Sequence, residues 1–297
     1  SFHMVVAEEF QGELRTLEKR GQKVQLAAGL DNQSILSDEA MERGLVCLRE
    51  FAQRLQGMDP ARVSVLATNA LRAARNRQVF IEQAEAVLGY PIEVIAGREE
   101  ARLIYLGVAH TLADDGGKRL VVDIGGGSTE VIVGEGDHIV SAASKNMGCI
   151  TLTQKFFSTH HIDPDLFVAA EAAARDTLAP LAAAYKDLSW NTELGTSGTI
   201  KAISWALQNL KISDGEITKE GLNSLRETIL SCHDHNEMAK KLHLNPRRSS
   251  VFCGGFVMLE QAFECFGLSY LKIAQGAIRE GMIADMIALD TASDESP

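Results

Sequence analysis

The 297-residue chain lacks the features that mark membrane, secreted and zinc-finger proteins. No apolar run approaches the ~20 residues of a membrane span, and the opening residues do not form a signal peptide. The chain has five cysteines, and no two of them form a Cys-x-x-Cys pair. Scattered cysteines of this kind argue against structural zinc and favour reduced thiols. We therefore expect a cytoplasmic protein without an integral membrane segment.

Positive charge is also scarce. The 29 Lys and Arg residues are outnumbered by 40 Asp and Glu residues, which gives a net charge of −11. A protein with this charge repels polyanions at long range, so we expect no nucleic-acid partner. A polyanionic ligand would have to be bound by local cations and a metal ion.

Two common nucleotide-binding motifs are absent, the dinucleotide fingerprint and the P-loop, but another glycine-rich motif is present. The apolar run 119–124 leads into Gly125-Gly126-Gly127-Ser128, and a second apolar run follows at 131–133. This pattern predicts a phosphate-binding hairpin, because glycine amides can approach anionic oxygens closely. Asp123 and Glu130 bring carboxylates to the same turn, as in sites that hold Mg²⁺ or Mn²⁺ or position a water. The alternative is a structural hairpin turn with a polar tip.

The hydrophobic patterns predict a mixed α/β chain built from two successive units. Each unit is expected to open with three strands and to continue with alternating helices and strands. A helix capped by Ser37 is predicted to extend to about residue 56. We predict domains at 1–104 and 105–297, with the last helix packing back on the first domain. Two units of one plan predict a ligand in the cleft between them.

Two further turns are weaker candidates for the site. Glu99 and Glu100 occupy the first turn of a helix predicted to begin at Gly97. Acidic residues there stabilise a helix by ~0.3–1 kcal/mol, but one that faces a cleft can also act as a general base. Residues 195–199 combine two glycines with three hydroxyls before a helix. They indicate either a second phosphate loop or an ordinary Ser/Thr cap.

Several other polar or aromatic residues have an ordinary structural interpretation as well. Arg72 and Arg279 each follow a predicted strand and are either phosphate clamps or surface residues. The motif 233–235, His-Asp-His, lies in a predicted connection between helices with no third ligand nearby, so we expect no metal there. We interpret Trp190 and Trp205 as core or rim packing.

The whole chain resembles the exopolyphosphatase/guanosine pentaphosphate phosphohydrolase family. The motifs that occur in the same order in that family are 1–4, 26–30, 68–72, 97–102, 123–130, 147–149, 195–199 and 276–281. The family belongs to the actin-like ATPase/sugar kinase superfamily. The resemblance therefore implies an α/β fold of two ribonuclease H-like domains around a central cleft. It also implies a bacterial hydrolase of the stringent response that releases terminal phosphate from inorganic polyphosphate, guanosine pentaphosphate or both.

The resemblance further implies roles for individual residues. Glu100 matches the family's catalytic glutamate, which activates the attacking water. Asp123 and Glu130 match carboxylates near a divalent metal, Mg²⁺ or Mn²⁺. The phosphate-binding positions are Ser1, Arg72, Gly125, Gly126, Gly127, Ser128, Ser197, Gly198, Thr199 and Arg279. Many family members are dimers, so a homodimer is among the expected assemblies.

The sequence departs from the family pattern at its start. Family members begin with a strand and an Asp-x-Gly-Ser-Asn-Ser phosphate loop, and Ser1 matches the last Ser of that loop. Longer members also carry a further C-terminal helical region, so the chain resembles the short, two-domain form. One alternative function is a non-catalytic sensor that binds polyphosphate or a guanosine alarmone in the same cleft. A sugar or acetate kinase would share the fold, but the motif at 97–102 argues against it.

Overall fold

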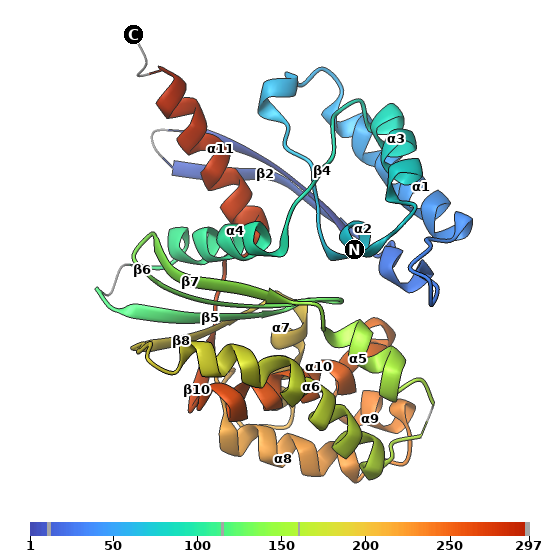
Figure 1. Cartoon of the computed structure of the whole chain (residues 1–297), viewed down its shortest axis with the longest axis vertical. Helices are drawn as coiled ribbons and strands as arrows, with labels where there is room; N and C mark the ends of the chain where they lie inside the picture. Colours follow the sequence, from blue (N-terminus) through green and yellow to red (C-terminus); the bar gives the residue numbers. More distant parts are fainter. Residues whose placement is uncertain (11–12, 114–115, 160, 295–297) are drawn as a thin grey trace. The chain divides into compact units, whose positions relative to one another are not determined.

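The chain divides into two compact units (Figure 1). The computed structural model describes residues 1–10, 13–113, 116–159 and 161–294. The first unit comprises Ser1–Glu99 and Met282–Pro297, and the second comprises Glu100–Gly281. The division falls in the first turn of helix α4 (Gly97–His110), before the boundary predicted after residue 104.

The first unit opens with two strands. Strands β1 (Phe2–Phe10) and β2 (Glu13–Gln22) form an antiparallel pair, and β3 (Leu66–Ala67) and β4 (Glu93–Val94) form a short parallel pair. The prediction of three opening strands is wrong for this unit within its described residues. After β2 the chain forms the 3₁₀ helix η1 (Leu26–Gly29), because Gln25 takes a left-handed φ of 54° that a strand does not accept.

Helix α1 (Asp38–Leu55) supplies most of the core of the first unit. Its Ser37 cap is confirmed, since the Ser37 hydroxyl accepts a 3.3 Å hydrogen bond from the Ala40 amide. The apolar face of α1 packs in one hydrophobic cluster with α3 (Arg77–Leu88). The first unit also contains η2 (Pro60–Arg62), α2 (Asn69–Ala73) and, from Met282 on, the last helix α11 (Ile278–Asp294).

The second unit is built on a six-stranded sheet with the order β7-β6-β5-β8-β10-β9. Its strands are β5 (Lys118–Ile124), β6 (Thr129–Glu135), β7 (His138–Lys145), β8 (Thr192–Thr196), β9 (Ile217–Thr218) and β10 (Tyr270–Ile273). β5, β6 and β7 form an antiparallel meander, whereas β8 runs parallel to β5 and β10 runs parallel to β8. Apart from the short β9, this is the strand order of a ribonuclease H-like domain. The predicted α/β fold class is confirmed.

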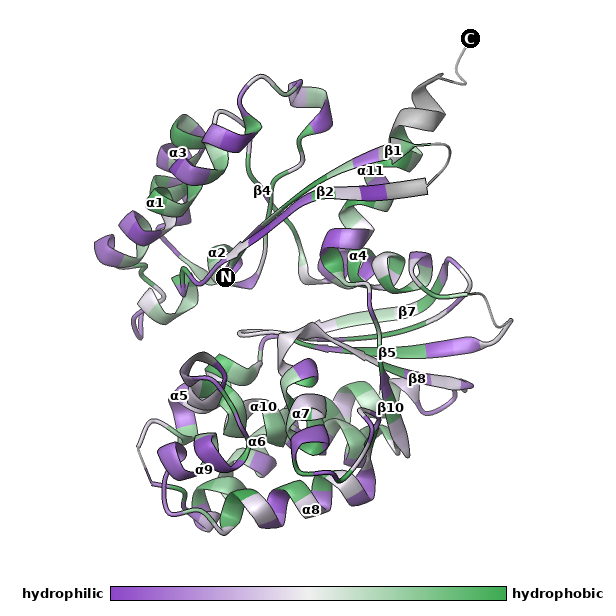
Figure 2. Cartoon of the chain, turned by 180° about the vertical axis from the view of Figure 1, so that it is seen from behind, coloured by the Kyte–Doolittle hydropathy of each residue, from purple (hydrophilic) through white to green (hydrophobic). Residues whose placement is uncertain are grey.

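Helices cover both faces of this sheet (Figure 1). One face packs against α5 (Cys149–Phe156), α6 (Pro164–Tyr185), α7 (Ser197–Asn209), α8 (Lys219–Leu230) and α10 (Pro246–Phe266). The other face packs against α4. Both faces of β5 are therefore buried, and the strand is hydrophobic over most of its length (Figure 2).

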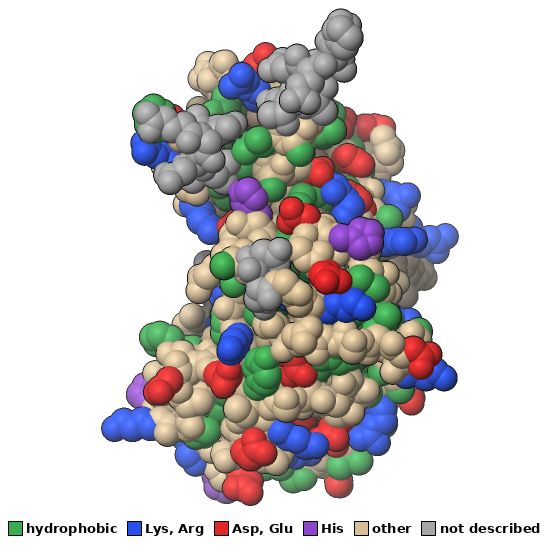
Figure 3. Space-filling view, turned by 90° about the vertical axis from the view of Figure 1, so that its left-hand side faces the viewer, with side chains coloured by type: hydrophobic (Ala, Val, Ile, Leu, Met, Phe, Trp, Pro, Cys, Tyr) green, Lys and Arg blue, Asp and Glu red, His purple; other side chains and the backbone are tan. Residues whose placement is uncertain are grey.

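Two elements of the second unit escape the sequence patterns. β9 is two residues long, and helix α9 (His235–Lys241) is short and hydrophilic (Figure 2). The last helix, α11, spans Ile278–Asp294. On the face shown in Figure 3, single acidic and basic side chains are scattered among uncharged ones. None of the helices, over the residues that are described, is long and apolar enough to cross a membrane.

Candidate active site

The predicted glycine hairpin is present in the second unit. β5 and β6 pair up to Ile124 and Thr129, and the turn between them closes with a 2.9 Å hydrogen bond from the Gly125 amide to the Ser128 carbonyl. The first amides of α5 then donate to the carbonyls of this turn, Cys149 to Gly125 at 2.9 Å and Ile150 to Gly126 at 2.8 Å. Helix α5 therefore fixes the shape of the turn from outside.

The carboxylates of Asp123 and Glu130 lie side by side on two neighbouring strands. These two residues are direct partners in the β5–β6 register. Because side chains alternate along a strand, both lie on the face of the sheet that also carries Val121 and Ile132, which is the face packed against α4. Glu100 belongs to the first turns of α4. All three carboxylates are buried, with exposed fractions of 8% for Asp123, 1% for Glu130 and 8% for Glu100.

The three carboxylates repel one another. Burial, and then the charge of Glu100, raise the pKa of Asp123 from 3.8 to about 7, while Lys201 acts in the opposite direction. Burial and the charges of Glu100 and Asp123 likewise raise the pKa of Glu130 well above its ordinary value. The Ser144 hydroxyl donates a 2.7 Å hydrogen bond to Glu130 and offsets part of this effect. The cluster is thus electrostatically unfavourable as it stands and is suited to bind a cation.

The second glycine-hydroxyl turn follows β8, the parallel neighbour of β5. Thr196 is paired with Asp123 in the β5–β8 register, so this turn emerges beside the acidic cluster. Ser197 has a φ of 93°, which is an unfavourable backbone conformation for a residue with a side chain. Strain of this kind persists where surrounding structure enforces it, and it occurs often at ligand-binding sites. The Ser197 hydroxyl also accepts a 3.3 Å hydrogen bond from the Ile200 amide.

Two cations at this site were not identified from the sequence. Lys201, one turn into α7, is close enough to lower the pKa of Asp123. Arg248, in the first turn of α10, lies directly over Gly198, where an added Cβ would overlap a guanidinium nitrogen. A cation in the first turn of a helix opposes the helix dipole, and this is the sequence signal that could have revealed Arg248.

A buried thiol links α5 to the second turn. Cys149 lies near both Thr199 and Arg248, whose interactions act against the effect of burial on its pKa. Burial dominates and raises the pKa of the Cys149 thiol. A buried, neutral thiol is a packing residue and not a nucleophile.

A divalent metal fits the donor set of this site. Asp123 and Glu130 offer hard carboxylate oxygens, and their raised pKa values show that the ionised forms are unfavourable unless a cation compensates their charge. Within the described parts of the chain, no three His, Cys, Asp or Glu side chains form a metal-binding group on their own. Mg²⁺ commonly takes one or two carboxylates and completes its shell with water and phosphate oxygens, so Asp123 and Glu130 provide enough protein ligands for it.

The remaining predicted residues belong to other elements of the chain. Ser1 and Arg72 belong to the first unit, where an Arg72 guanidinium nitrogen donates a 2.9 Å hydrogen bond to the Ile95 carbonyl. Their phosphate-binding role, and that of Arg279 on α11, stay predictions. Asp234 in the His-Asp-His motif caps α9 through 2.8 Å hydrogen bonds from two amides, which gives that motif a structural role.

The glycine hairpin and the buried acidic cluster lie on a ribonuclease H-like sheet, which defines an α/β protein of that fold class. A model of the Ppx/GppA phosphatase family matches residues 5–289, and the chain belongs to this family.

Solved structures of similar proteins have the same fold. An exopolyphosphatase from Cytophaga hutchinsonii is 23% identical and superposes with a TM-score of 0.85 over 96% of this chain and 94% of that one. The Ppx/GppA enzyme of Aquifex aeolicus is 24% identical, with a TM-score of 0.78 and 95% of each chain covered. These structures show the shared fold, and the family assignment supports a phosphatase-type hydrolase.

Proposed function

We infer that the protein is a phosphoanhydride hydrolase that removes terminal phosphate from inorganic polyphosphate, guanosine pentaphosphate or both. Membership of a phosphatase family supports hydrolysis of phosphate bonds. The observation that carries the inference is the convergence of Glu100, Asp123 and Glu130 beside the glycine hairpin.

Binding of the terminal phosphates falls to the two glycine turns. In the first turn the Gly125 amide already donates to the Ser128 carbonyl and the Ser128 hydroxyl is hydrogen-bonded to Glu130, so phosphate donors come from the rest of that turn. The hydroxyls of Ser197 and Thr199 are the donors of the second turn. Lys201 and Arg248 add positive charge where the acidic cluster alone would repel a polyanion. An arginine over a glycine turn is well placed for charge-assisted hydrogen bonds to phosphate.

Glu100 is the general base in this proposal. Its carboxylate accepts a proton from water while the water oxygen attacks the terminal phosphorus. The new phosphorus–oxygen bond forms as the bond to the bridging oxygen breaks, and the shortened chain leaves as an oxyanion. Inorganic phosphate is the second product.

Asp123 and Glu130 would hold the divalent metal, Mg²⁺ or Mn²⁺. When bound, such an ion neutralises charge on the phosphate oxygens as the leaving oxyanion develops. Both carboxyls must release their protons to bind it, so the raised pKa of Asp123 predicts Mg²⁺ affinity that increases as pH rises towards and beyond about 7.

The test is phosphate release from defined polyphosphate and from guanosine pentaphosphate, each with Mg²⁺ and with EDTA. The proposal predicts release that needs the metal and does not need a sugar or acetate acceptor. Binding of both compounds without phosphate release would instead indicate a sensor. Transfer from ATP to an added acceptor would indicate a kinase.

A further inference from the structure

The threonine that precedes α7 makes an unusual hydrogen bond. Thr196 is the N-cap residue of α7, a position where a Thr hydroxyl commonly accepts a hydrogen bond from an amide of the first helical turn. Here the hydroxyl accepts no such bond from the described residues of α7, and it donates a 3.0 Å hydrogen bond to the Gly276 carbonyl. Thr196 is fully buried, and a buried hydrogen bond is electrostatically stronger than one in water. An ordinary cap therefore does not explain Thr196.

The missing cap concerns two amides at the start of α7. Gly198 and Thr199 are the second and third residues of the helix, and their amides are the ones that an N-cap side chain would bind. Amides at these positions have no carbonyl partner within the helix, and they point towards the end of the helix that attracts anions. Without a cap from Thr196, these two amides are suited to phosphate oxygens.

The acceptor of the Thr196 hydrogen bond is itself fixed. The Gly276 amide donates a 3.0 Å hydrogen bond to the hydroxyl of Thr111, which directly follows α4. Gly276 also packs on the backbone of α4, where an added Cβ would overlap the Gly107 carbonyl oxygen. Both hydrogen-bonding groups of Gly276 are thus paired. Gly276 therefore links the second glycine turn to the helix that carries Glu100.

The sheet brings the two partners to the same level. β8 and β10 are parallel, and Gly195 is paired with Ile273. A 2.9 Å hydrogen bond from the Ala274 amide to the Gly195 carbonyl continues this pairing. The bond between Thr196 and Gly276 extends it to the point where the chain enters the strained conformation of Ser197.

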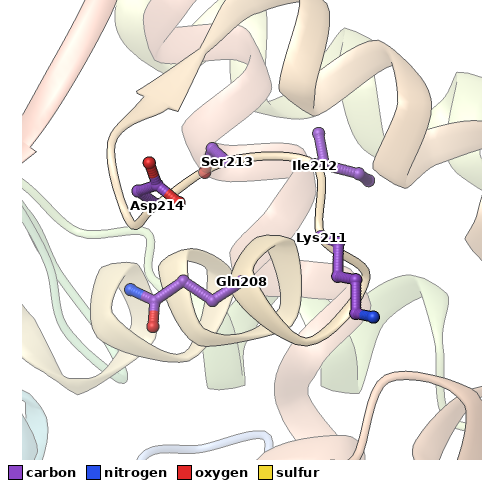
Figure 4. A pocket seen from close by; sticks show the side chains of 5 residues that line it. All are labelled: Gln208, Lys211, Ile212, Ser213 and Asp214. Atoms are coloured by element: carbon purple, nitrogen blue, oxygen red, sulfur yellow. The ribbon is translucent and has the colours of Figure 1, made fainter.

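Open space borders the segment that contains Gly276. The preceding residue, Gln275, lines a cavity of about 330 Å³ together with Ser204 and Lys272. A neighbouring cavity of about 410 Å³ lies at the C-terminal end of α7 (Figure 4), and it is lined by Gln208, Lys211, Ile212, Ser213 and Asp214. Because packing is incomplete on this side, the hydrogen bonds of Gly276 contribute strongly to its position.

We propose that Thr196 is a positioning residue of the phosphate site. Its hydroxyl anchors the second glycine turn to Gly276 and leaves the amides of Gly198 and Thr199 to the terminal phosphate. Through Gly276 and Thr111, the same anchor fixes the turn relative to α4 and its Glu100. A displaced turn would hold the phosphorus at the wrong distance from the attacking water. This proposal rests on the phosphate site of the proposed function.

Steady-state kinetics on polyphosphate with Mg²⁺ test the anchor. Thr196→Val keeps the shape of the side chain and removes the donor, so it should lower kcat/KM about 10- to 100-fold, the cost of a misplacement of about 1 Å. Thr196→Ser keeps the hydroxyl and should recover most of the activity. Thr228→Val is the matched control, because it removes a 2.9 Å hydrogen bond from a Thr hydroxyl to a backbone carbonyl on α8, and it should stay near the wild type. A lower melting temperature of Thr196→Val with normal kcat/KM would show a purely structural role and overturn the proposal.

Binding without turnover separates this proposal from the proposed function. In a Glu100→Gln background with Mg²⁺, calorimetry should show that Thr196→Val binds inorganic triphosphate roughly 2- to 10-fold more weakly than Thr196→Ser, the loss that one hydrogen bond predicts. Equal affinities would overturn the anchor even if the wild type releases phosphate. Weaker binding by Thr196→Val in a protein whose wild type releases no phosphate would support the anchor and contradict hydrolysis.

Thr111 tests the other half of the anchor. Thr111→Val removes the acceptor of the Gly276 amide and should lower kcat/KM in the same direction as Thr196→Val, by a smaller factor. If both hydroxyls act through Gly276, the double variant should lose little more than Thr196→Val alone. Fully additive losses would contradict a shared anchor.

Discussion

Replacing Asp123 with Asn should stabilise the metal-free protein at alkaline pH and have little effect in acid. In the folded protein the pKa of Asp123 is about 7, whereas its ordinary value is 3.8. The unfolded chain therefore releases this proton first, and stability falls as pH rises from about 4 to about 7. The difference between the two pKa values corresponds to a loss of roughly 4 kcal/mol in the free energy of unfolding, of which about 3 kcal/mol falls between pH 5 and pH 8. The asparagine side chain of the variant has no carboxyl proton to release and avoids this loss.

Urea denaturation at pH 5 and pH 8, with EDTA present, measures this effect. Glu260, whose pKa is also raised to about 7, contributes the same pH dependence to both proteins and cancels in the comparison. The contribution of Glu130 is smaller in the variant, because the charge of Asp123 helps to raise the Glu130 pKa, and it therefore acts in the same direction. Replacement of the exposed Asp187 by Asn is the matched control and should change neither value. Mg²⁺ should stabilise the wild type at pH 8 more than the Asp123→Asn variant. Equal losses of stability by the wild type and the variant between pH 5 and pH 8 would contradict the raised pKa of Asp123.

Three further substitutions test the packing of the site. Arg248→Ala should raise KM for phosphate substrates by about 10- to 150-fold, which is the loss expected for one charge-assisted hydrogen bond, and should change the melting temperature little. Arg175→Ala, on α6, is the control. An unchanged KM of Arg248→Ala would contradict a phosphate-binding role of Arg248. Ser197→Gly should stabilise the fold by ~1 kcal/mol in urea titrations, because glycine adopts a φ of 93° without strain. The same variant should bind phosphate more weakly, because it lacks the hydroxyl. Lower stability of the variant would contradict backbone strain at Ser197. Gly281→Ala should destabilise the fold by ~1–3 kcal/mol in thermal melts, because the new Cβ would overlap the Leu103 carbonyl oxygen of α4. Gly221→Ala is the control, since its Cβ would meet its first neighbour at 3.3 Å. Equal melting temperatures of the two variants would contradict the predicted overlap.

The local parts of the site could be predicted from the sequence because local patterns determine them. The glycine hairpin follows from two apolar strands joined by a run of glycines, and the partnership of Asp123 and Glu130 follows from the short turn between them. The Ser37 cap was predictable for the same reason. Their signals lie within a few residues of the structure that they specify.

The non-local parts could not be predicted from local patterns. Arg248 reaches the second glycine turn only because α10 packs against α5 and α7. Its place in the first turn of a helix is unusual for a cation, but this local signal does not say which turn it contacts. The exposure of Trp205 depends on which side of α7 meets the sheet. The strained φ of Ser197 has no sequence signal, because serine is an ordinary residue at the start of a helix.

The most direct test of the account compares phosphate release by Glu100→Gln and Glu99→Gln. The two variants make the same chemical change at neighbouring positions of one helix turn, but only Glu100 acts on the charges of Asp123 and Glu130. Removal of a general base should lower kcat by about 10²- to 10⁴-fold while the substrate still binds, and Glu99→Gln should stay close to the wild type. Equal activity of the two variants on both polyphosphate and guanosine pentaphosphate would contradict the role assigned to Glu100.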